Sequence, residues 1–233
     1  MFGGKELFDR SLEEANAGDA FAMFNVALCY QTGEGVDEDH AQAFAWFLKA
    51  AEAGSDRAMY NLAMCYVAGD GTAPDPVRAF EWFQKASALG DARATYSVGI
   101  CYQEGVGVEK DARTGFEWVE KAARAGLGEA TSNIGMCYMV GDGVERDEVR
   151  GREWFQKGSE LGDALSIFDL GFCYERGCGV EQDYEKAFEL YMEAAQAGLP
   201  NAMQGVAHCY EEGLGVVQND EKAREWYDKA SRV

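Results

Sequence analysis

The sequence predicts an all-α fold, an α-solenoid of six 36-residue helix-turn-helix repeats preceded by an N-terminal capping helix. Cysteines recur every 36 residues, each followed by tyrosine, at Cys29, Cys65, Cys101, Cys137, Cys173 and Cys209. Three glycine series keep the same period and begin at Gly18, Gly33 and Gly35. Such self-similarity at a fixed period of about 20 to 50 residues is typical of a solenoid.

The repeats follow one another without insertion or deletion. Tryptophan keeps the same step at Trp46, Trp82, Trp118, Trp154 and Trp226, with Leu190 in the one gap. Counted from the first glycine, the predicted repeats are 18–53, 54–89, 90–125, 126–161, 162–197 and 198–233. We interpret residues 1–17 as a half-repeat.

Each repeat carries two helical patterns. In the first repeat, the spacing i, i+4, i+7, i+8 joins Ala22, Val26, Cys29 and Tyr30. Gly33 ends this helix, because glycine adopts the left-handed conformation of a helix C-terminus without a Cβ penalty. Helical spacing returns at Ala43, Trp46, Phe47, Ala50 and Ala51, up to Gly54. Neither helix can bury its stripe alone, so stacked helix pairs must share a continuous core.

The two ends of the chain differ. Phe8, Leu12 and Ala15 have helical spacing within 6–17, which predicts a helix that caps the first repeat. At the other end, Trp226 and Tyr227 lie in the final helix with none after it. We therefore expect either that the sequence is truncated there or that a partner covers that end, and a homo-oligomer joined through the C-terminal helix is one form of the second alternative.

The charge balance restricts the partners. The chain has 21 Lys and Arg against 41 Asp and Glu, a net charge of −20, and 47% of its residues are hydrophobic. This composition is that of an ordered globular chain. A field of this sign repels phosphate backbones and anionic headgroups, which excludes nucleic acid and membrane surfaces as expected partners. The longest apolar stretches fall short of the about 20 residues that a membrane span needs.

The seven cysteines are expected to be free. Packed helices lie about 8–10 Å apart, whereas a disulfide needs Cα atoms about 4.4–6.8 Å apart, so equivalent cysteines cannot pair or share a metal. His40 and His208 add no ligand set with zinc-site spacing. Cys178, in a predicted loop, is a candidate reactive thiol, although its neighbours do not favour the thiolate. Free thiols predict a reducing, cytoplasmic compartment; removal of a signal peptide stays open as the alternative.

Motifs of known chemistry are missing. The Gly-x-Gly loops lack the Lys-Ser/Thr of a phosphate-binding loop and the third glycine of a dinucleotide turn, so a turn explains them. The chain contains no Ser-x-x-Lys, His-Glu-x-x-His or Gly-x-Ser-x-Gly. We expect no cofactor, no metal and no catalytic residue.

The repeated pattern Ala-x₃-(Val/Leu/Ile)-(Ala/Gly)-x-Cys-Tyr-x₂-Gly-x-Gly-Val-x₂-Asp, followed by Ala-x₂-Trp-x₂-Lys-Ala-(Ala/Ser)-x₂-Gly, resembles the Sel-one-like repeat (SLR) family, relatives of tetratricopeptide repeats. The resemblance covers residues 18–233. It implies a right-handed α-solenoid whose first helices line the concave side, and an adaptor or scaffold that gathers other proteins. Because some relatives have been linked to β-lactam binding or hydrolysis, a weak enzyme of that kind is an alternative by analogy.

Single repeats depart from this pattern. In the first half of the unit, the departures are Ser166 for Ala, Thr72 for Val and Asn219 for Asp. In the second helix, they are Leu190 for Trp, Glu193 for Lys, and Gly115, Gly151 and Gly158 for Ala. Each of these glycines is expected to soften its helix by about 0.8–1 kcal/mol relative to alanine.

A second stripe on the first helices is the candidate binding site, because it lies nearly opposite the core stripe. Its first position holds Phe24, Tyr60, Tyr96, Ser132, Phe168 and Gln204. Its second position holds Leu28, Met64, Ile100, Met136, Phe172 and His208. These side chains are mostly apolar, yet they vary while the core positions do not.

The resemblance places this stripe on the concave face, so we expect a groove for a peptide or helix of a partner protein. Packing against a neighbouring repeat is the structural alternative. The last repeat is polar in this stripe, at Gln204, His208, Glu211 and Glu212. The favoured function is therefore a non-catalytic protein-protein interaction adaptor for a basic or amphipathic segment; a structural spacer is a further alternative.

Overall fold

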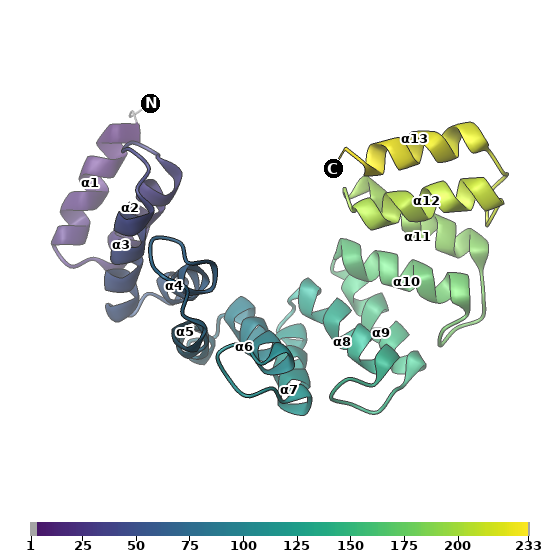
Figure 1. Ribbon diagram of the computed structural model, residues 1–233, viewed down its shortest axis with the longest axis horizontal. Helices are drawn as coiled ribbons and strands as arrows, with labels where there is room; N and C mark the ends of the chain where they lie inside the picture. The colour runs from purple at the N-terminus through teal and green to yellow at the C-terminus, as the bar shows by residue number, and fades with distance from the viewer. Residues whose placement is uncertain (1–3, 233) are drawn as a thin grey trace. The chain divides into compact units, whose positions relative to one another are not determined.

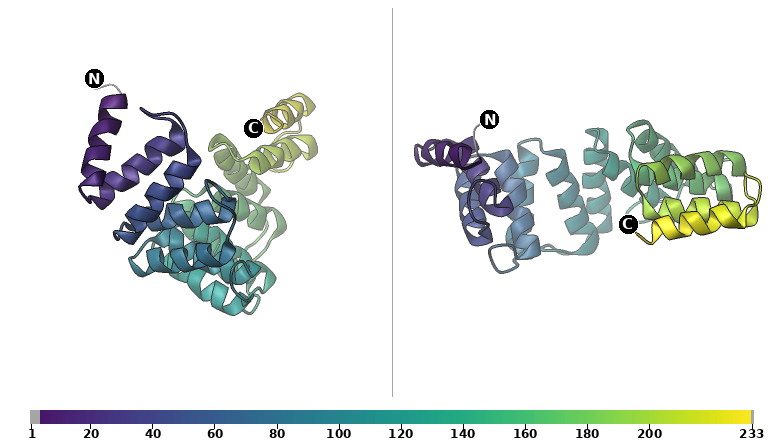
Figure 2. Two further views of the ribbon diagram at one scale, coloured as in Figure 1. Left: turned by 60° about the vertical axis from the view of Figure 1, so that its left-hand side comes forward. Right: turned by 90° about the horizontal axis from the view of Figure 1, so that it is seen from above.

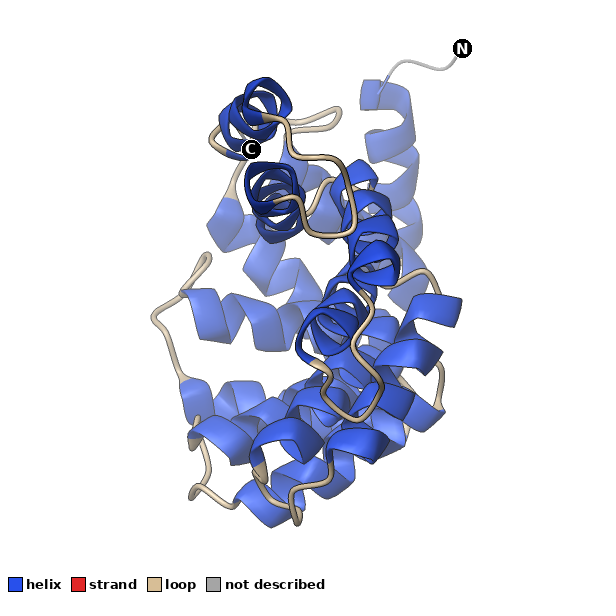
Figure 3. Ribbon diagram, turned by 90° about the vertical axis from the view of Figure 1, so that its right-hand side faces the viewer, coloured by secondary structure: helices blue, strands red, loops and turns tan. Residues whose placement is uncertain are grey.

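The computed structural model describes residues 4–232, which form thirteen helices and no strand (Figure 1; Figure 3). The helices are α1 Gly4–Asn16, α2 Ala20–Thr32, α3 His40–Glu52, α4 Asp56–Ala68, α5 Pro76–Ala88, α6 Ala92–Glu104, α7 Ala112–Arg124, α8 Gly128–Val140, α9 Glu148–Glu160, α10 Ala164–Arg176, α11 Tyr184–Gln196, α12 Pro200–Glu212 and α13 Asp220–Ala230. The all-α prediction of helix pairs after one N-terminal helix is confirmed. None of these helices is long and apolar enough to cross a bilayer.

Capping residues set the helix ends. The Asp19 carboxylate accepts a hydrogen bond from the Ala22 amide at 2.8 Å and so starts α2. Gly33 ends α2 with a φ of 73°, as the sequence predicts. Asn219, one of the departures from the pattern, still caps α13, because its side-chain oxygen accepts from the Lys222 amide at 2.9 Å. The eighteen glycines of the three predicted series all have positive φ.

An edge-to-face pair of rings joins successive repeats and explains the tyrosine after several of the cysteines. Phe44 of α3 meets Tyr66 of α4 with centroids 5.2 Å apart and ring planes at 86°. The equivalent pairs are Phe8–Tyr30, Phe80–Tyr102 and Phe188–Tyr210. Such T-shaped contacts add about 0.5–1.5 kcal/mol beyond the apolar area they bury.

The helix α1 acts as the second helix of a repeat. Phe8 and Ala15 are buried, and Phe8 pairs with Tyr30 in the geometry of the later repeats. The predicted N-terminal cap is therefore confirmed.

The helices form two compact units, one that ends at Trp118 and one that begins at Val119, so their boundary falls inside α7. In the first unit, α3 packs against α2 and α4. In the second, α11 packs in the same way against α10 and α12, and successive helices lie side by side (Figure 2). Each unit therefore has its own stack of helix pairs.

The three helix glycines are sites of close packing. A Cβ on Gly158 would overlap the hydroxyls of Ser166 and Thr131, which lie 3.2 Å from each other. On Gly151 it would meet the Met139 sulfur at 2.7 Å, and on Gly115 it would meet Gln103 Cγ at 2.6 Å. The destabilisation expected from the sequence counts only the low helix propensity of glycine. In the structure, side chains of neighbouring helices occupy the space that each alanine methyl group would fill. The departures at Ser166 and Gly158 are therefore coupled, because the Ser166 side chain fills the space that an alanine methyl group at position 158 would need.

Candidate partner-binding surface

The first position of the predicted stripe packs inside the repeat. Phe24 is only 7% exposed, and its ring lies 5.9 Å from that of Phe47 in the paired helix. Likewise, Tyr60 pairs with Phe83 at 5.7 Å, and Phe168 pairs with Tyr191 at 5.3 Å. Tyr96 is half-buried. Packing therefore describes this position better than a groove does, but the rings pack within their own repeat and not, as the alternative had it, against a neighbouring one.

Tyr60 is covered from a second side. The guanidinium of Arg93, in the next repeat, lies 4.5 Å from the Tyr60 ring centroid. Asp91 holds Arg93 through an ion pair at 3.1 Å. The hydrogen bond that Arg93 donates to the Asp91 carboxylate is the main cause that raises the pKa of Arg93. Tyr60 thus belongs to a contact between repeats more than to a free surface.

The second position of the stripe faces solvent. Met64, Met136 and Phe172 are 41%, 46% and 42% exposed. His208 is exposed, and Leu28 and Ile100 are half-buried. Exposure of large apolar side chains at equivalent places in several repeats is what a binding surface requires.

The structure adds residues to this face that the sequence pattern did not single out. Phe21 and Leu165 lie seven residues before Leu28 and Phe172, and both are exposed. Val67 and Val140 follow Met64 and Met136 by three and four residues and are also exposed. These spacings place each of them on the same helix face. Helical spacing alone could have found them.

Two patches result, one in each unit. The unit 1 patch consists of Phe21, Leu28, Met64, Val67 and Ile100. The unit 2 patch consists of Met136 and Val140 on α8, and of Leu165 and Phe172 on α10. The helices α8 and α10 pack directly against each other.

A buried hydroxyl–carboxylate pair lies among the unit 2 helices. Ser132 replaces the aromatic ring of other repeats, and its hydroxyl donates to the Asp169 carboxylate at 2.9 Å. Asp169 is 8% exposed. Burial raises the pKa of Asp169 to about 6, although the Ser132 hydrogen bond opposes the rise.

On α12 the same face is polar. His208, Glu211 and Glu212 are exposed, and their ligand atoms lie within 4.8 Å of one another. The Tyr227 hydroxyl donates to Glu211 at 2.9 Å. Among residues 4–232, this is the group whose spacing could hold a metal ion. All three side chains lie on the exposed face of one helix, and this arrangement suits basic groups of a partner as well as it suits a metal ion.

The outward face of α13 is also polar. Arg224 and Asp228 are exposed, whereas the equivalent positions of α3 hold Phe44 and Leu48, which pack against the core. A second copy stacked on α13 would bury these two charges, which is unfavourable without ion partners. This polarity weakens the expectation of a homo-oligomer through the C-terminal helix.

In several repeats, the tryptophan and lysine of the pattern form a cation–π pair. Lys49 lies 3.9 Å from the Trp46 ring centroid, and Lys85 lies 3.7 Å from that of Trp82. The fifth repeat has lost both partners together, with Leu190 and Glu193. This explains two departures that the sequence left unconnected: without the ring, the lysine has no face to cover.

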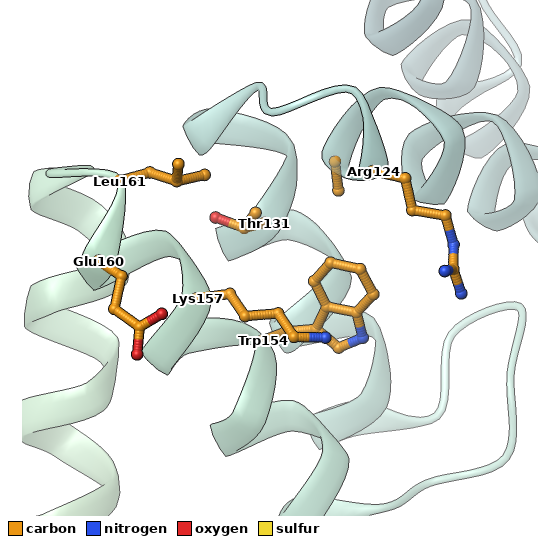
Figure 4. Close-up of a pocket in the computed structure, with 7 residues that line it drawn as sticks. Arg124, Thr131, Trp154, Lys157, Glu160 and Leu161 are labelled. Atoms are coloured by element: carbon orange, nitrogen blue, oxygen red, sulfur yellow. The ribbon is translucent and has the colours of Figure 1, made fainter.

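One such pair borders a hollow of about 430 Å³ in the second unit (Figure 4). It is lined by Ala123, Arg124, Thr131, Trp154, Lys157, Glu160 and Leu161. Lys157 lies 4.1 Å from the Trp154 ring centroid, Arg124 is paired with Glu120, and the Thr131 hydroxyl donates to the Gly128 carbonyl. Because Lys157, Arg124 and Thr131 already have partners, the hollow is a weaker candidate than the patches.

The seven cysteines are free. Burial raises the pKa of Cys101 to about 11 and that of Cys173 to about 12, so both are thiols at neutral pH. Cys178 lies half-buried in a loop, and burial together with Glu148 raises its pKa. A raised pKa makes a reactive thiolate less available.

Stacked pairs of helices that repeat every 36 residues define an α-solenoid of helix-turn-helix repeats. The chain belongs to the Sel1 repeat family, which matches residues 20–55, 56–91, 92–127, 128–163, 164–199 and 200–232. These repeats begin two residues later than the boundaries counted from glycine. A search of functionally curated proteins found no match.

Solved structures agree with this membership. A protective antigen of uropathogenic Escherichia coli strains that displays an SLR fold is 32% identical, with a TM-score of 0.87 over 97% of this chain and 48% of the antigen. The chain therefore spans about half the length of that protein. A Sel1 repeat protein from Oxalobacter formigenes is 33% identical, with a TM-score of 0.86 over 91% of this chain and 85% of that one.

A more distant likeness concerns the fold alone. An immunity protein from Pseudomonas aeruginosa is 23% identical, with a TM-score of 0.62 over 91% of this chain and 81% of that chain.

Proposed function

We propose that this protein is a non-catalytic adaptor that binds a segment of a partner protein on the exposed patches of its first helices. The exposure of Met64, Met136 and Phe172 carries the proposal, because the stack does not need large apolar side chains in water. The names of the structural relatives, a protective antigen and an immunity protein, fit a role exerted through contact with other molecules. The net charge of −20 favours a basic or amphipathic segment.

The absence of catalysis is part of the proposal. Ser132 and Asp169 form a hydroxyl–carboxylate pair, but both are buried, so a substrate does not reach them. The free, mostly buried thiols support a reducing, cytoplasmic environment. Turnover of a chromogenic cephalosporin that persists through repurification would contradict this part.

The affinity expected from such a surface is moderate. Burial of one large apolar side chain contributes roughly 1.5–3 kcal/mol. Three or four anchors therefore supply about 5–10 kcal/mol before ordering costs, which corresponds to a dissociation constant in roughly the micromolar range.

A displayed library of random 20-residue segments tests the proposal. Segments are selected on the wild-type chain and then offered to a face variant with Met64→Ser, Met136→Ser and Phe172→Ser. All three side chains are exposed, so the variant should fold, as circular dichroism would verify. We expect the face variant to lose most of the selected segments.

A matched control carries Leu89→Ser, Val149→Ser and Leu161→Ser, three exposed apolar residues outside the patches. It should retain binding. Equal loss in both variants, or equal retention, would contradict a binding role for the patches.

A further inference from the structure

The width of the unit 2 patch fits one kind of occupant. Leu165 and Phe172, both exposed on α10, are seven residues apart. A rise of 1.5 Å per residue separates them by about 10.5 Å along the helix axis, and a helix with its side chains has a diameter of about 10–12 Å. A β-strand occupies only about 4.7–4.9 Å beside its neighbour. The patch is therefore as wide as a helix.

The length of the patch sets a spacing for that occupant. Met136 and Phe172 hold equivalent positions on α8 and α10, which pack directly against each other. Axes of packed helices lie about 8–10 Å apart. Seven residues of a helix rise by about 10.5 Å and return to nearly the same face. A helix laid across α8 and α10 thus meets the two exposed side chains with residues about seven apart.

The charge beyond the patch sets the direction in which the occupant lies. At the next equivalent position, α12 presents His208 with Glu211 and Glu212. Neither glutamate forms an ion pair with another of residues 4–232. Arg176 lies 5.7 Å from the Phe172 ring centroid and is paired with Glu175 at 3.1 Å. At the equivalent position one repeat beyond the patch, the charge without an ion partner is therefore negative and lies on α12.

We infer that the unit 2 patch binds an amphipathic helix of a partner, with two large apolar residues seven apart and a basic residue about seven positions beyond. The apolar residues cover Met136 and Phe172, and the basic end lies on α12. This inference rests on the proposed function and specifies its partner.

The displayed library tests the pattern. Among segments lost on Met136→Ser with Phe172→Ser, we expect enrichment of apolar residues at i and i+7 and of Lys or Arg about seven positions outside that pair. Enrichment of an extended pattern, with apolar residues two or three apart, would overturn the inference and leave the proposed function standing. Selection of no segment that depends on the patch would overturn both.

A fluorescent 20-residue helical peptide then measures each contact by anisotropy. The peptide has leucines at positions 4 and 11 and lysine at 18, and the matched peptides carry glutamate at 18 or move the second leucine to position 9. We expect the glutamate peptide to bind about three- to tenfold more weakly at low salt and the shifted peptide about tenfold more weakly. Equal binding of all three would overturn the inference.

Variants of this protein test where the apolar part and the basic end of the peptide bind. Phe172→Ser should weaken the binding of the leucine–lysine peptide by about tenfold or more. Glu211→Gln with Glu212→Gln should weaken it about three- to tenfold, with a smaller effect at high salt. Glu221→Gln with Glu225→Gln, two exposed charges on α13, removes the same net charge elsewhere and should change binding less than twofold. If the α13 pair weakens binding as much as the α12 pair does, the basic end is not placed on α12.

Discussion

The helices α10 and α12 occupy equivalent positions in successive repeats, yet their equivalent polar contacts differ in exposure to solvent. The Tyr191 hydroxyl donates to Glu175 of α10 at 2.8 Å, and the Tyr227 hydroxyl donates to Glu211 of α12 at 2.9 Å. Tyr191 is 2% exposed and Tyr227 is 40% exposed. Burial is the main cause that raises the pKa of Tyr191. The repeat thus specifies which atoms meet, while the packing around them decides what the contact contributes.

The same comparison separates structural from available groups. In α10, Asp169 is buried, and Leu165 and Phe172 are exposed. The equivalent residues of α12 are Gly205, Asn201 and His208. One helix therefore offers an apolar surface above a buried carboxyl group, and the other offers exposed charge. Substitutions at equivalent positions of the two repeats should therefore change the free energy of unfolding by different amounts, more where the residue is buried than where it is exposed.

The largest effect is expected at Asp169. Its pKa is about 6 when folded, against an ordinary value of 3.8. The folded chain therefore binds more protons between these values, and stability falls as the pH rises through that window. Asp169→Asn, which restores the residue of Asn25, Asn61 and Asn133, should raise the free energy of unfolding by up to about 3 kcal/mol at pH 7.

Urea denaturation of both proteins at pH 4 and pH 7 checks this prediction. The difference between variant and wild type should be small at pH 4 and grow toward pH 7. A constant difference would show that the folded and unfolded pKa values are alike.

Phe168 and Gln204 hold the equivalent position of α10 and α12 and should differ next. Phe168→Ala removes a ring that packs against Tyr191 at 5.3 Å and should lower the free energy of unfolding by about 2–3 kcal/mol. Gln204 is exposed, so Gln204→Ala should change it by less than about 0.5 kcal/mol. Denaturant midpoints measured side by side decide the matter, and similar shifts would contradict the assignment of this position to packing.

Gly158 should be intolerant of alanine because the Ser166 side chain, in the first turn of α10, occupies the space of the methyl group. Gly158→Ala would force the new methyl group onto the Ser166 and Thr131 hydroxyls and should lower the unfolding free energy by about 1–3 kcal/mol, although alanine favours a helix. One repeat later, the equivalent residues are Ala194 of α11 and Ala202 of α12, and both are buried. Adding Ser166→Ala should recover much of the loss in thermal unfolding. A stabilised single variant would indicate that helix propensity dominates there.

The smallest contrast concerns the two tyrosine–glutamate pairs. Tyr191→Phe leaves buried Glu175 without its hydroxyl donor and should lower the free energy of unfolding by about 1–2 kcal/mol. Tyr227→Phe, at the exposed pair, should change it by less than about 0.5 kcal/mol. Chemical denaturation of the two single variants measures the contrast. Equal losses would mean that solvent exposure does not weaken the second pair.

Much of the fold could be predicted, because a repeated sequence states its own structural requirements six times. Gly33 and its equivalents predicted the helix ends, and Phe8 predicted the capping helix through its helical spacing. The candidate site was predicted less completely. Phe24 and Phe172 look alike in a helical projection, but only the first faces a ring of the paired helix. A single helix pattern cannot distinguish these cases, since the distinguishing atoms belong to another helix.

By itself, the sequence determined the all-α class, the six repeats, the turn glycines and the negative charge, because these depend on local backbone preference, periodicity and composition. Only the tertiary structure decided which variable residues are exposed, why Gly158 accompanies Ser166, and why Asp169 resists ionisation. These properties depend on the distance between side chains of different helices and on the water excluded between them. Helical spacing within one chain segment contains neither quantity.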